Sequence, residues 1–387
     1  MSDVFQSRFH SALTSLISER GIETDDVRET AVTTLTELAL ESARLGGQRL
    51  PDHFEELMTA HLPKVGLRLR ADVARRLSVC DHLPERVAAI LADDVPVVAV
   101  PVLRHNEALA ASDLLRIAED AEAEKARAIA ERTTLDARII TALAGRGDPV
   151  IADSLLRNHA DRLDEALCEQ LAGVSGLGCS AACRLIDRAS LSDAALARLF
   201  WIVDADTRIR VLDRIDLRHP ARSGGGGLPE GDLARRIDGA GDALFGLAAR
   251  GERAALARKL ADQIDLPPAV RDRIIADRSG EALAVALNAA EIGAKTATGI
   301  LLLTVPDAGR SYPVLRRLAG LTETQSPAMA RLIVDLWRSA EGKARPASRH
   351  EPAVARPGET RRAETAGSRR ADSIRTRITR QTGTKEG

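Results

Sequence analysis

Aromatic side chains are scarce in this 387-residue chain, which contains two Trp, one Tyr and five Phe. Apolar residues still make up 44% of the sequence, so a core must be built mainly from Ala, Leu, Ile and Val. Ala and Leu favour helices, and closely packed Ala-rich helices need few aromatic side chains. The composition therefore predicts an all-α protein.

Long apolar runs are also absent. The two longest, residues 95–103 and 299–305, are far shorter than a membrane-spanning helix. Residues 1–16 lack the apolar stretch of a signal peptide. Four cysteines are sparse for a disulfide scaffold and are typical of a protein from a reducing compartment. We therefore expect a soluble, cytoplasmic protein with no membrane span.

The motifs of common enzyme classes are missing too. The chain has no Gly-rich phosphate-binding loop with its lysine, no strand-linked Gly-x-Gly-x-x-Gly unit, no Gly-x-Ser-x-Gly elbow and no His-Glu-x-x-His pair. His53 and His61 share one predicted helix but stand two turns apart, too far for a simple chelate. The sequence therefore predicts a non-enzymatic protein with no cofactor and no metal.

Charge is unevenly distributed along the chain. Residues 341–387 hold 12 Lys or Arg and 6 Asp or Glu, a net charge of +6, so the remaining 340 residues carry −7. The acidic body argues against nucleic-acid binding by the body itself. The basic C-terminal segment has almost no large apolar residue, so we expect it to be disordered. A nucleic-acid-associated protein that uses this tail is one alternative function.

A repeat is visible in the spacing of leucines. The segment Leu83-Pro84-Glu85 precedes a short apolar helix pattern, with the proline and the acid placed as at a helix start. The same frame recurs in steps of 26, 26, 28 and 28 residues. The five leucines that define it, called anchor leucines here, are Leu83, Leu109, Leu135, Leu163 and Leu191.

Other columns support this register. Eight residues after each anchor stands a large apolar residue: Leu91, Ile117, Leu143, Leu171 and Leu199. Further anchors are expected at Leu217, Leu266, Ile292 and Leu321, and Leu50 marks a degenerate first unit. One unit of two short helices cannot bury its own apolar stripe, whereas stacked units can. We therefore predict an all-α solenoid of two-helix repeats of about 26 residues, with a non-repetitive helical bundle as the alternative.

These units resemble a known class of repeat. With their pairs Leu91-Ala92, Ile117-Ala118, Leu143-Ala144 and Leu171-Ala172, they are similar to the leucine-rich variant repeat, a HEAT-like helical repeat. Residues 283–337 also resemble an uncharacterised alphaproteobacterial domain-of-unknown-function family. Together the resemblance covers roughly residues 70–340. It implies a solenoid fold in a bacterial cytoplasmic protein and no particular chemistry.

Breaks in the pattern predict five parts. Residues 1–66 should form an N-terminal helical cap and residues 67–218 a helical repeat array. Four consecutive glycines at 224–227 would strongly destabilise a helix, so 219–231 should be a flexible linker or loop. Residues 232–340 should form C-terminal helical repeats, and residues 341–387 a disordered basic tail.

Polar residues gather just before the anchor leucines. In a stacked array, equivalent turns align, so these side chains are expected to form one strip that suits carboxylate-bearing or peptide partners. The alternative is that turns are simply polar and solvated. The predicted function is a non-enzymatic protein-binding scaffold or adaptor, for example in bacterial signalling. The predicted binding residues are Arg104, His105, Arg132, Arg157, Asn158, His159 and Arg188.

The cysteines give a second alternative. Cys168, Cys179 and Cys183 lie within 16 residues, and Cys179-x3-Cys183 places two thiols on one side of a helix. A zinc site usually has four ligands, and His159 is a candidate for the fourth. Cys168 occupies an apolar repeat position and Cys183 lies among small residues, where a free thiol packs as a small hydrophobe. We therefore expect buried structural thiols, with a metal or cluster site as the alternative.

Overall fold

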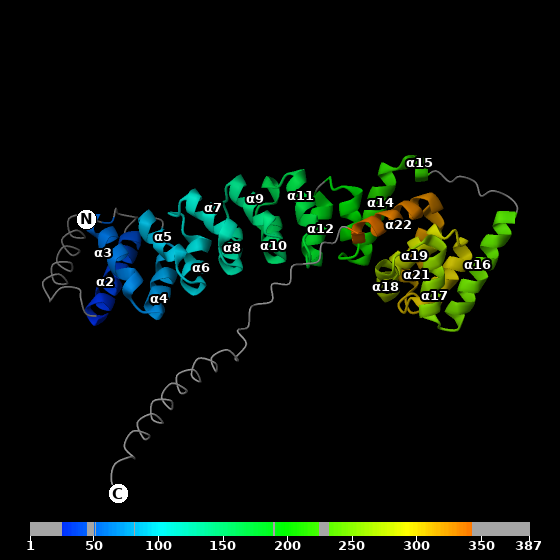
Figure 1. Ribbon diagram of the computed structural model, residues 1–387, viewed down its shortest axis with the longest axis horizontal. Helices are drawn as coiled ribbons and strands as arrows, with labels where there is room; N and C mark the ends of the chain where they lie inside the picture. The colour runs from blue at the N-terminus through cyan, green and yellow to red at the C-terminus, as the bar shows by residue number, and fades with distance from the viewer. Residues whose placement is uncertain are drawn as a thin grey trace, which may run out of the picture. The chain divides into compact units, whose positions relative to one another are not determined.

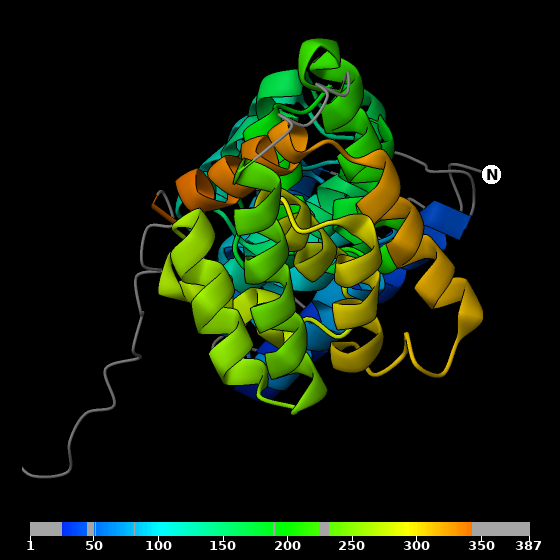
Figure 2. The same cartoon turned by 90° about the vertical axis from the view of Figure 1, so that its right-hand side faces the viewer.

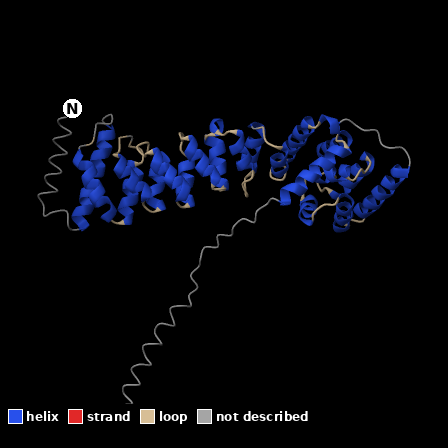
Figure 3. Cartoon of the chain, turned by 45° about the horizontal axis from the view of Figure 1, so that its top comes forward, coloured by secondary structure: helices blue, strands red, loops and turns tan. Residues whose placement is uncertain are grey.

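A computed structural model describes residues 25–44, 50, 52–80, 82–188, 190–223 and 232–342. These residues belong to one unit, residues 1–344. Their regular secondary structure is helical, and Figure 3 shows no strand among them. The all-α prediction is confirmed for this part of the chain. The beginning of the predicted cap (1–24), most of the predicted linker (224–231) and the predicted tail from 343 onward lie outside the described residues.

The first part of the unit is an array of short helices. From α2 to α13, successive helices alternate between two layers, because most helices contact the helix two places further along the chain, as α4 contacts α6 and α7 contacts α9 (Figure 1). The helices are α2 (Asp25–Arg44), α3 (Asp52–His61), α4 (Leu67–Leu77), α5 (Glu85–Asp93), α6 (Pro96–His105), α7 (Ala111–Asp120), α8 (Ala123–Ala130), α9 (Ala137–Gly145), α10 (Pro149–Asn158), α11 (Glu165–Ala172), α12 (Cys179–Arg188), α13 (Asp193–Leu199), α14 (Ala205–Arg218) and α15 (Pro220–Ser223).

The predicted repeat register is confirmed over the five anchor leucines. Every anchor is buried in a turn between two helices, and every residue of the column eight positions later is buried in the following helix. The first step of 28 residues has a local cause, a 3-10 helix η2 (Ala160–Arg162) that lengthens the turn after α10. The second follows a long turn, residues 173–178, between α11 and α12.

Two expectations at the end of the array are wrong. Leu217 is not a buried anchor, because it lies inside α14 with 80% of its surface exposed. Pro220–Ser223, expected to begin the linker, forms the short helix α15. The repeat register is therefore interrupted at α14.

Residues 232–342 fold differently, as a bundle around one central helix. All nine residues of α19 are buried, as expected for a helix that is apolar nearly all round. Figure 2 shows helices crowded together in this part, and α19 contacts α14, α17, α18, α20, α21 and α22. The helices are α16 (Asp232–Ala249), α17 (Arg253–Ile264), α18 (Pro268–Ala276), α19 (Glu281–Ala289), α20 (Ala294–Thr304), α21 (Tyr312–Thr324) and α22 (Pro327–Gly342).

The expected register holds only partly in this bundle. Ile292 is buried in the turn between α19 and α20, as predicted for an anchor, and Ile300 is buried eight residues later. Leu321, by contrast, lies inside α21 rather than in a turn. None of the described helices combines the length and apolar character that crossing a membrane requires.

Polar side chains join neighbouring repeats of the array. Helix C-termini leave backbone carbonyls without an intrahelical partner. In this array a side chain from a later repeat donates to such carbonyls or to the carbonyl of an anchor leucine, 25 to 33 residues earlier. We call these contacts cross-repeat hydrogen bonds. Their donors are Asn106, Lys125, Arg132, Arg146, Arg162, Arg214 and Arg218.

The array meets the bundle through an aromatic cluster and a buried ionic cluster. Phe200, Trp201 and Trp337 form the aromatic cluster, with ring centroids 4.9–5.4 Å apart. The ionic cluster is centred on Arg208 of α14. Its guanidinium lies 2.8 Å from Asp277 and 3.4 Å from Glu281 of the bundle. Buried charges of both signs therefore connect the two parts of the unit.

Candidate functional site

The predicted binding residues divide into two groups. His105, Asn158 and Arg188 are exposed. Arg104 and Arg157 also reach the surface, but each has an acidic partner within the array: Arg104 Nε lies 2.5 Å from Glu131 Oε2, and Arg157 pairs with an aspartate one helical turn earlier. Among the described residues, Arg188 has no ion-pair partner, so it is the arginine of this set with the most capacity for an external anion.

The other two predicted residues are buried, so the expectation of an exposed strip is wrong for them. Arg132 donates from Nη1 to the carbonyl of Leu103, 2.9 Å away, and this is a cross-repeat hydrogen bond. His159 is only 1% exposed. Burial lowers the pKa of His159, although a hydrogen bond to the backbone of Arg132 acts in the opposite direction. Both side chains stabilise the stack from inside.

A groove lies where α12 and α14 end side by side. Its volume is about 300 Å³, and it is lined by Arg188, Ser190, Arg214, Leu217 and Arg218. Three of these five residues are arginines and none is acidic. We call it the arginine groove. Leu217 presents an exposed apolar side chain among the three guanidinium groups.

Two of the groove's arginines are held in place by hydrogen bonds to backbone carbonyls. Arg218 Nη1 donates to the carbonyl of Leu191 at 2.5 Å and lies 3.0 Å from Asp193. Arg214 donates to the carbonyl of Ile186 at the end of α12. Cations are favoured at helix C-termini, where unpaired carbonyls give partial negative charge. The Arg214 contact therefore stabilises the end of α12, and both contacts fix the positions of the guanidinium groups.

The opposite ends of α12 and α14 bring two thiols and a carboxylate together. Cys179 begins α12, and its Sγ lies 3.9 Å from Sγ of Cys183, one turn later. Asp204, the residue preceding α14, places Oδ2 3.8 Å from Cys183 Sγ. Thr207 Oγ1 is also 3.8 Å from this sulfur. We call Cys179, Cys183 and Asp204 the thiol cluster, and their ligand atoms lie within 4.8 Å of one another.

The cysteine expectation is corrected at this point. Cys168 is buried in α11 as predicted, and burial raises the pKa of its thiol. Cys179, however, is exposed and so is not a buried structural thiol, and Cys183 is only half-buried, although it packs against the core. Burial is also the main cause that raises the pKa of Cys183. Within the thiol cluster the third ligand candidate is Asp204, which no spacing along the sequence groups with the two cysteines.

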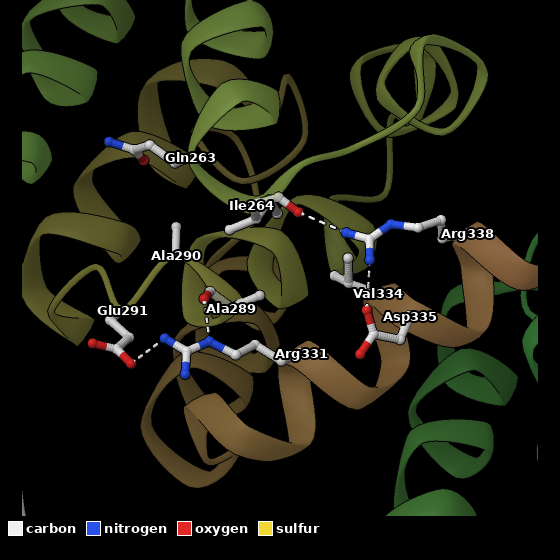
Figure 4. A pocket seen from close by; sticks show the side chains of 9 residues that line it. All are labelled: Gln263, Ile264, Ala289, Ala290, Glu291, Arg331, Val334, Asp335 and Arg338. Atoms are coloured by element: carbon white, nitrogen blue, oxygen red, sulfur yellow. Dashed lines mark hydrogen bonds and ion pairs between the residues drawn. The ribbon is translucent and has the colours of Figure 1, made fainter.

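A second pocket, of about 270 Å³, lies in the bundle between the ends of α17 and α19 and the side of α22 (Figure 4). Its arginines already have partners within it. Arg331 donates to the carbonyl of Ala289 and pairs with Glu291, and Arg338 donates to the carbonyl of Ile264 and pairs with Asp335. These pairs cap the two helix ends, so the pocket offers less unmatched charge than the arginine groove.

Residues 98–224 match a family described as "Uncharacterised protein conserved in bacteria (DUF2336)". The match runs from within α6 through α15 and contains both the arginine groove and the thiol cluster. Comparison with curated proteins and with solved structures gave no match. Similarity to an uncharacterised bacterial family therefore holds for this stretch. The resemblance noted for residues 283–337 lies outside it, and the leucine-rich variant assignment stays a prediction.

Proposed function

We propose that this chain is a non-enzymatic protein-binding scaffold whose arginine groove receives an acidic segment of a bacterial partner protein. The observation that carries the proposal is the groove's composition, three arginines around one exposed leucine without an acidic lining residue. A guanidinium group presents a planar set of donors that matches a carboxylate in a two-bonded arrangement. An acidic side chain next to an apolar one fits both features of this surface.

Preorganisation supports the same site. Binding costs less when the recognising side chains are already fixed before the partner arrives. Arg214 and Arg218 are fixed by their bonds to the carbonyls of Ile186 and Leu191. Arg188 stands beside them with no ion-pair partner among the described residues. The groove therefore combines two anchored cations with one adjustable cation, and arginines in such settings often dominate binding energy.

The proposal can be tested by site-specific photo-crosslinking in the source bacterium. A photo-reactive phenylalanine analogue would replace Leu217, and the matched control would replace Val79, which is 68% exposed in the turn after α4. We expect a partner protein to be captured from position 217 and not from position 79. Mass spectrometry of the crosslinked peptide should place the contact on an acidic segment.

Charge substitutions make the test specific. Arg188→Glu in the photo-reactive chain should reduce the crosslink strongly, whereas Arg138→Glu, at an exposed arginine of α9, should leave it unchanged. A chain lacking residues 341–387 should still capture the partner. If capture is insensitive to Arg188→Glu and disappears with the C-terminal truncation, the groove is not the binding site. Recovery of nucleic acid through those C-terminal residues would favour the alternative function instead.

A further inference from the structure

The thiol cluster has the spacing of a metal-ligand set. In a tetrahedral zinc site with Zn–S bonds of about 2.3 Å and a Zn–O bond of about 2.0 Å, two sulfurs are about 3.8 Å apart and a sulfur and an oxygen about 3.5 Å apart. The Sγ atoms of Cys179 and Cys183 are 3.9 Å apart, and Cys183 Sγ is 3.8 Å from Asp204 Oδ2. These two pairs therefore need shifts of only a few tenths of an ångström to bind one zinc ion, and Cys179 and Asp204, whose ligand atoms lie within 4.8 Å of each other, need to move closer together.

Helix geometry disfavours the competing explanation, a disulfide. Residues four apart on an α-helix have Cβ atoms about 5–6 Å apart, whereas a disulfide needs about 3.5–4.5 Å. Cys179 and Cys183 are both within α12, so a bond between them would require the first turn of that helix to unwind. A metal ion bridges the two thiolates without this change, because it lies between the sulfurs.

We propose that Cys179, Cys183 and Asp204 bind one Zn²⁺ ion, with water completing a four-coordinate site. Two thiolates and one carboxylate are ligands that zinc accepts, and thiolates select zinc over the hard cations Mg²⁺ and Ca²⁺. Cys179 and Asp204 are exposed, which leaves room for the water ligand and a path for the ion. No catalytic role is needed for this site, since it joins two helices of the array.

The surroundings hold the carboxylate in place. Asp204 Oδ1 accepts a hydrogen bond from the backbone N–H of Thr207 at 2.9 Å, which caps α14 and fixes the side chain. The Thr207 hydroxyl donates to Asp204 Oδ2 at 3.2 Å, and Arg210 Nη2 donates to the same hydroxyl at 2.9 Å. Such outer hydrogen bonds orient metal ligands and support affinity. Both helix N-termini also favour negative charge at these positions.

Zinc binding at the thiol cluster would link two successive repeats. The cysteines belong to α12 and Asp204 to the start of α14, with α13 between them in the chain. A zinc ion would therefore fasten the ends of two stacked helices whose opposite ends form the arginine groove. The inference does not depend on the proposed function, because zinc binding is measured on the purified chain alone.

The test uses the full-length chain, reduced and freed of metal, and titrated with ZnCl₂ by calorimetry and with CoCl₂ by absorption spectroscopy. We expect one ion per chain and a thiolate-to-cobalt charge-transfer band. Cys179→Ser or Cys183→Ser should weaken affinity by more than about 10-fold, the least that loss of even an outer-shell partner usually costs. Cys168→Ala, at a thiol outside the cluster, should change neither result.

Asp204→Asn separates ligand loss from misfolding. Asn caps helices about as well as Asp, so melting of the metal-free variant should match that of the parent chain. Its zinc affinity should nevertheless fall, and zinc should no longer raise its melting temperature as it raises that of the parent. The proposal is overturned if the parent chain binds no zinc or cobalt. It is equally overturned if binding survives unchanged in the Cys179→Ser and Cys183→Ser double variant.

Discussion

Replacing Glu281 by Gln should destabilise the contact between the array and the bundle. Glu281 is fully buried, and its carboxylate lies between two arginines, 2.8 Å from Arg317 Nη2 and 3.4 Å from Arg208 Nη1. Gln keeps the size of the side chain and removes its charge, so the two guanidinium groups lose a buried partner. The free energy of unfolding should fall because a buried charge without its counter-charge is strongly unfavourable.

The size of this loss in unfolding free energy depends on which partners the two arginines keep. Removing one partner of a buried ion pair costs about 3–5 kcal/mol. Arg208 keeps Asp277 at 2.8 Å, and the Arg317 side chain is 26% exposed, so water can partly solvate it. We therefore expect a loss near the low end of that range, about 3 kcal/mol. A double variant, Glu281→Gln with Arg317→Met, should lose about 2 kcal/mol less than the two single variants added together.

The assay is urea unfolding followed by tryptophan fluorescence. The two tryptophans of the chain, Trp201 and Trp337, have ring centroids 4.9 Å apart where the array meets the bundle, so the signal reports on this contact. The midpoint for Glu281→Gln should fall by roughly 1 M urea. The matched control is Asp206→Asn, because Asp206 is 90% exposed and lies 3.6 Å from the same Arg317. An unchanged midpoint for Glu281→Gln, or an equal shift for the control, would refute the reasoning.

Three further results are expected. Leu143→Asp should unfold the repeats around α9, since an unpaired buried carboxylate costs several kcal/mol, whereas Arg138→Asp should melt like the parent. Arg132→Ala should lower the free energy of unfolding by about 2 kcal/mol through the lost bond to Leu103, against less than about 0.5 kcal/mol for Arg138→Ala; equal values would place Arg132 at the surface. Burial lowers the pKa of His159 below its ordinary 6.5, so below that pH the unfolded chain binds more protons than the folded chain. Stability should therefore fall as pH drops from 7 through 6.5 towards the lowered pKa, and His159→Gln should flatten this dependence in denaturant titrations at several pH values.

The buried core positions of the array were predictable because apolar residues recur at fixed spacings along the sequence. Anchor leucines and the column eight residues later are apolar in unit after unit, and a periodic apolar pattern is what stacking helices require. The same rule misplaced Leu321. Two apolar residues eight positions apart can also lie in two helices that are joined by another kind of turn. Residue spacing along the chain does not tell a stacked array from a bundle wrapped around a central helix such as α19.

The polar residues were less predictable for a physical reason. Arg132 and Arg188 each stand three residues before an anchor, yet Arg132 is buried against Leu103 and Arg188 lines an open groove. The units differ in length, with a step of 26 residues to Leu135 and 28 to Leu191, so equal sequence positions do not meet equal surroundings. The closeness of Asp204 to Cys183 likewise depends on how two helices align, which no local pattern records.

The cross-repeat hydrogen bonds give the array a direction. Each donor follows its acceptor in the chain, as in the bonds from Arg132 to Leu103 and from Arg214 to Ile186. Losing a unit at either end exposes the former partner groups to water, but the groups differ: donor side chains remain at the N-terminal end and backbone carbonyls at the C-terminal end. The C-terminal end of the array therefore presents carbonyls that a following structure can cover. The bundle fills that place, with α19 and α22 packed against α14 and α13.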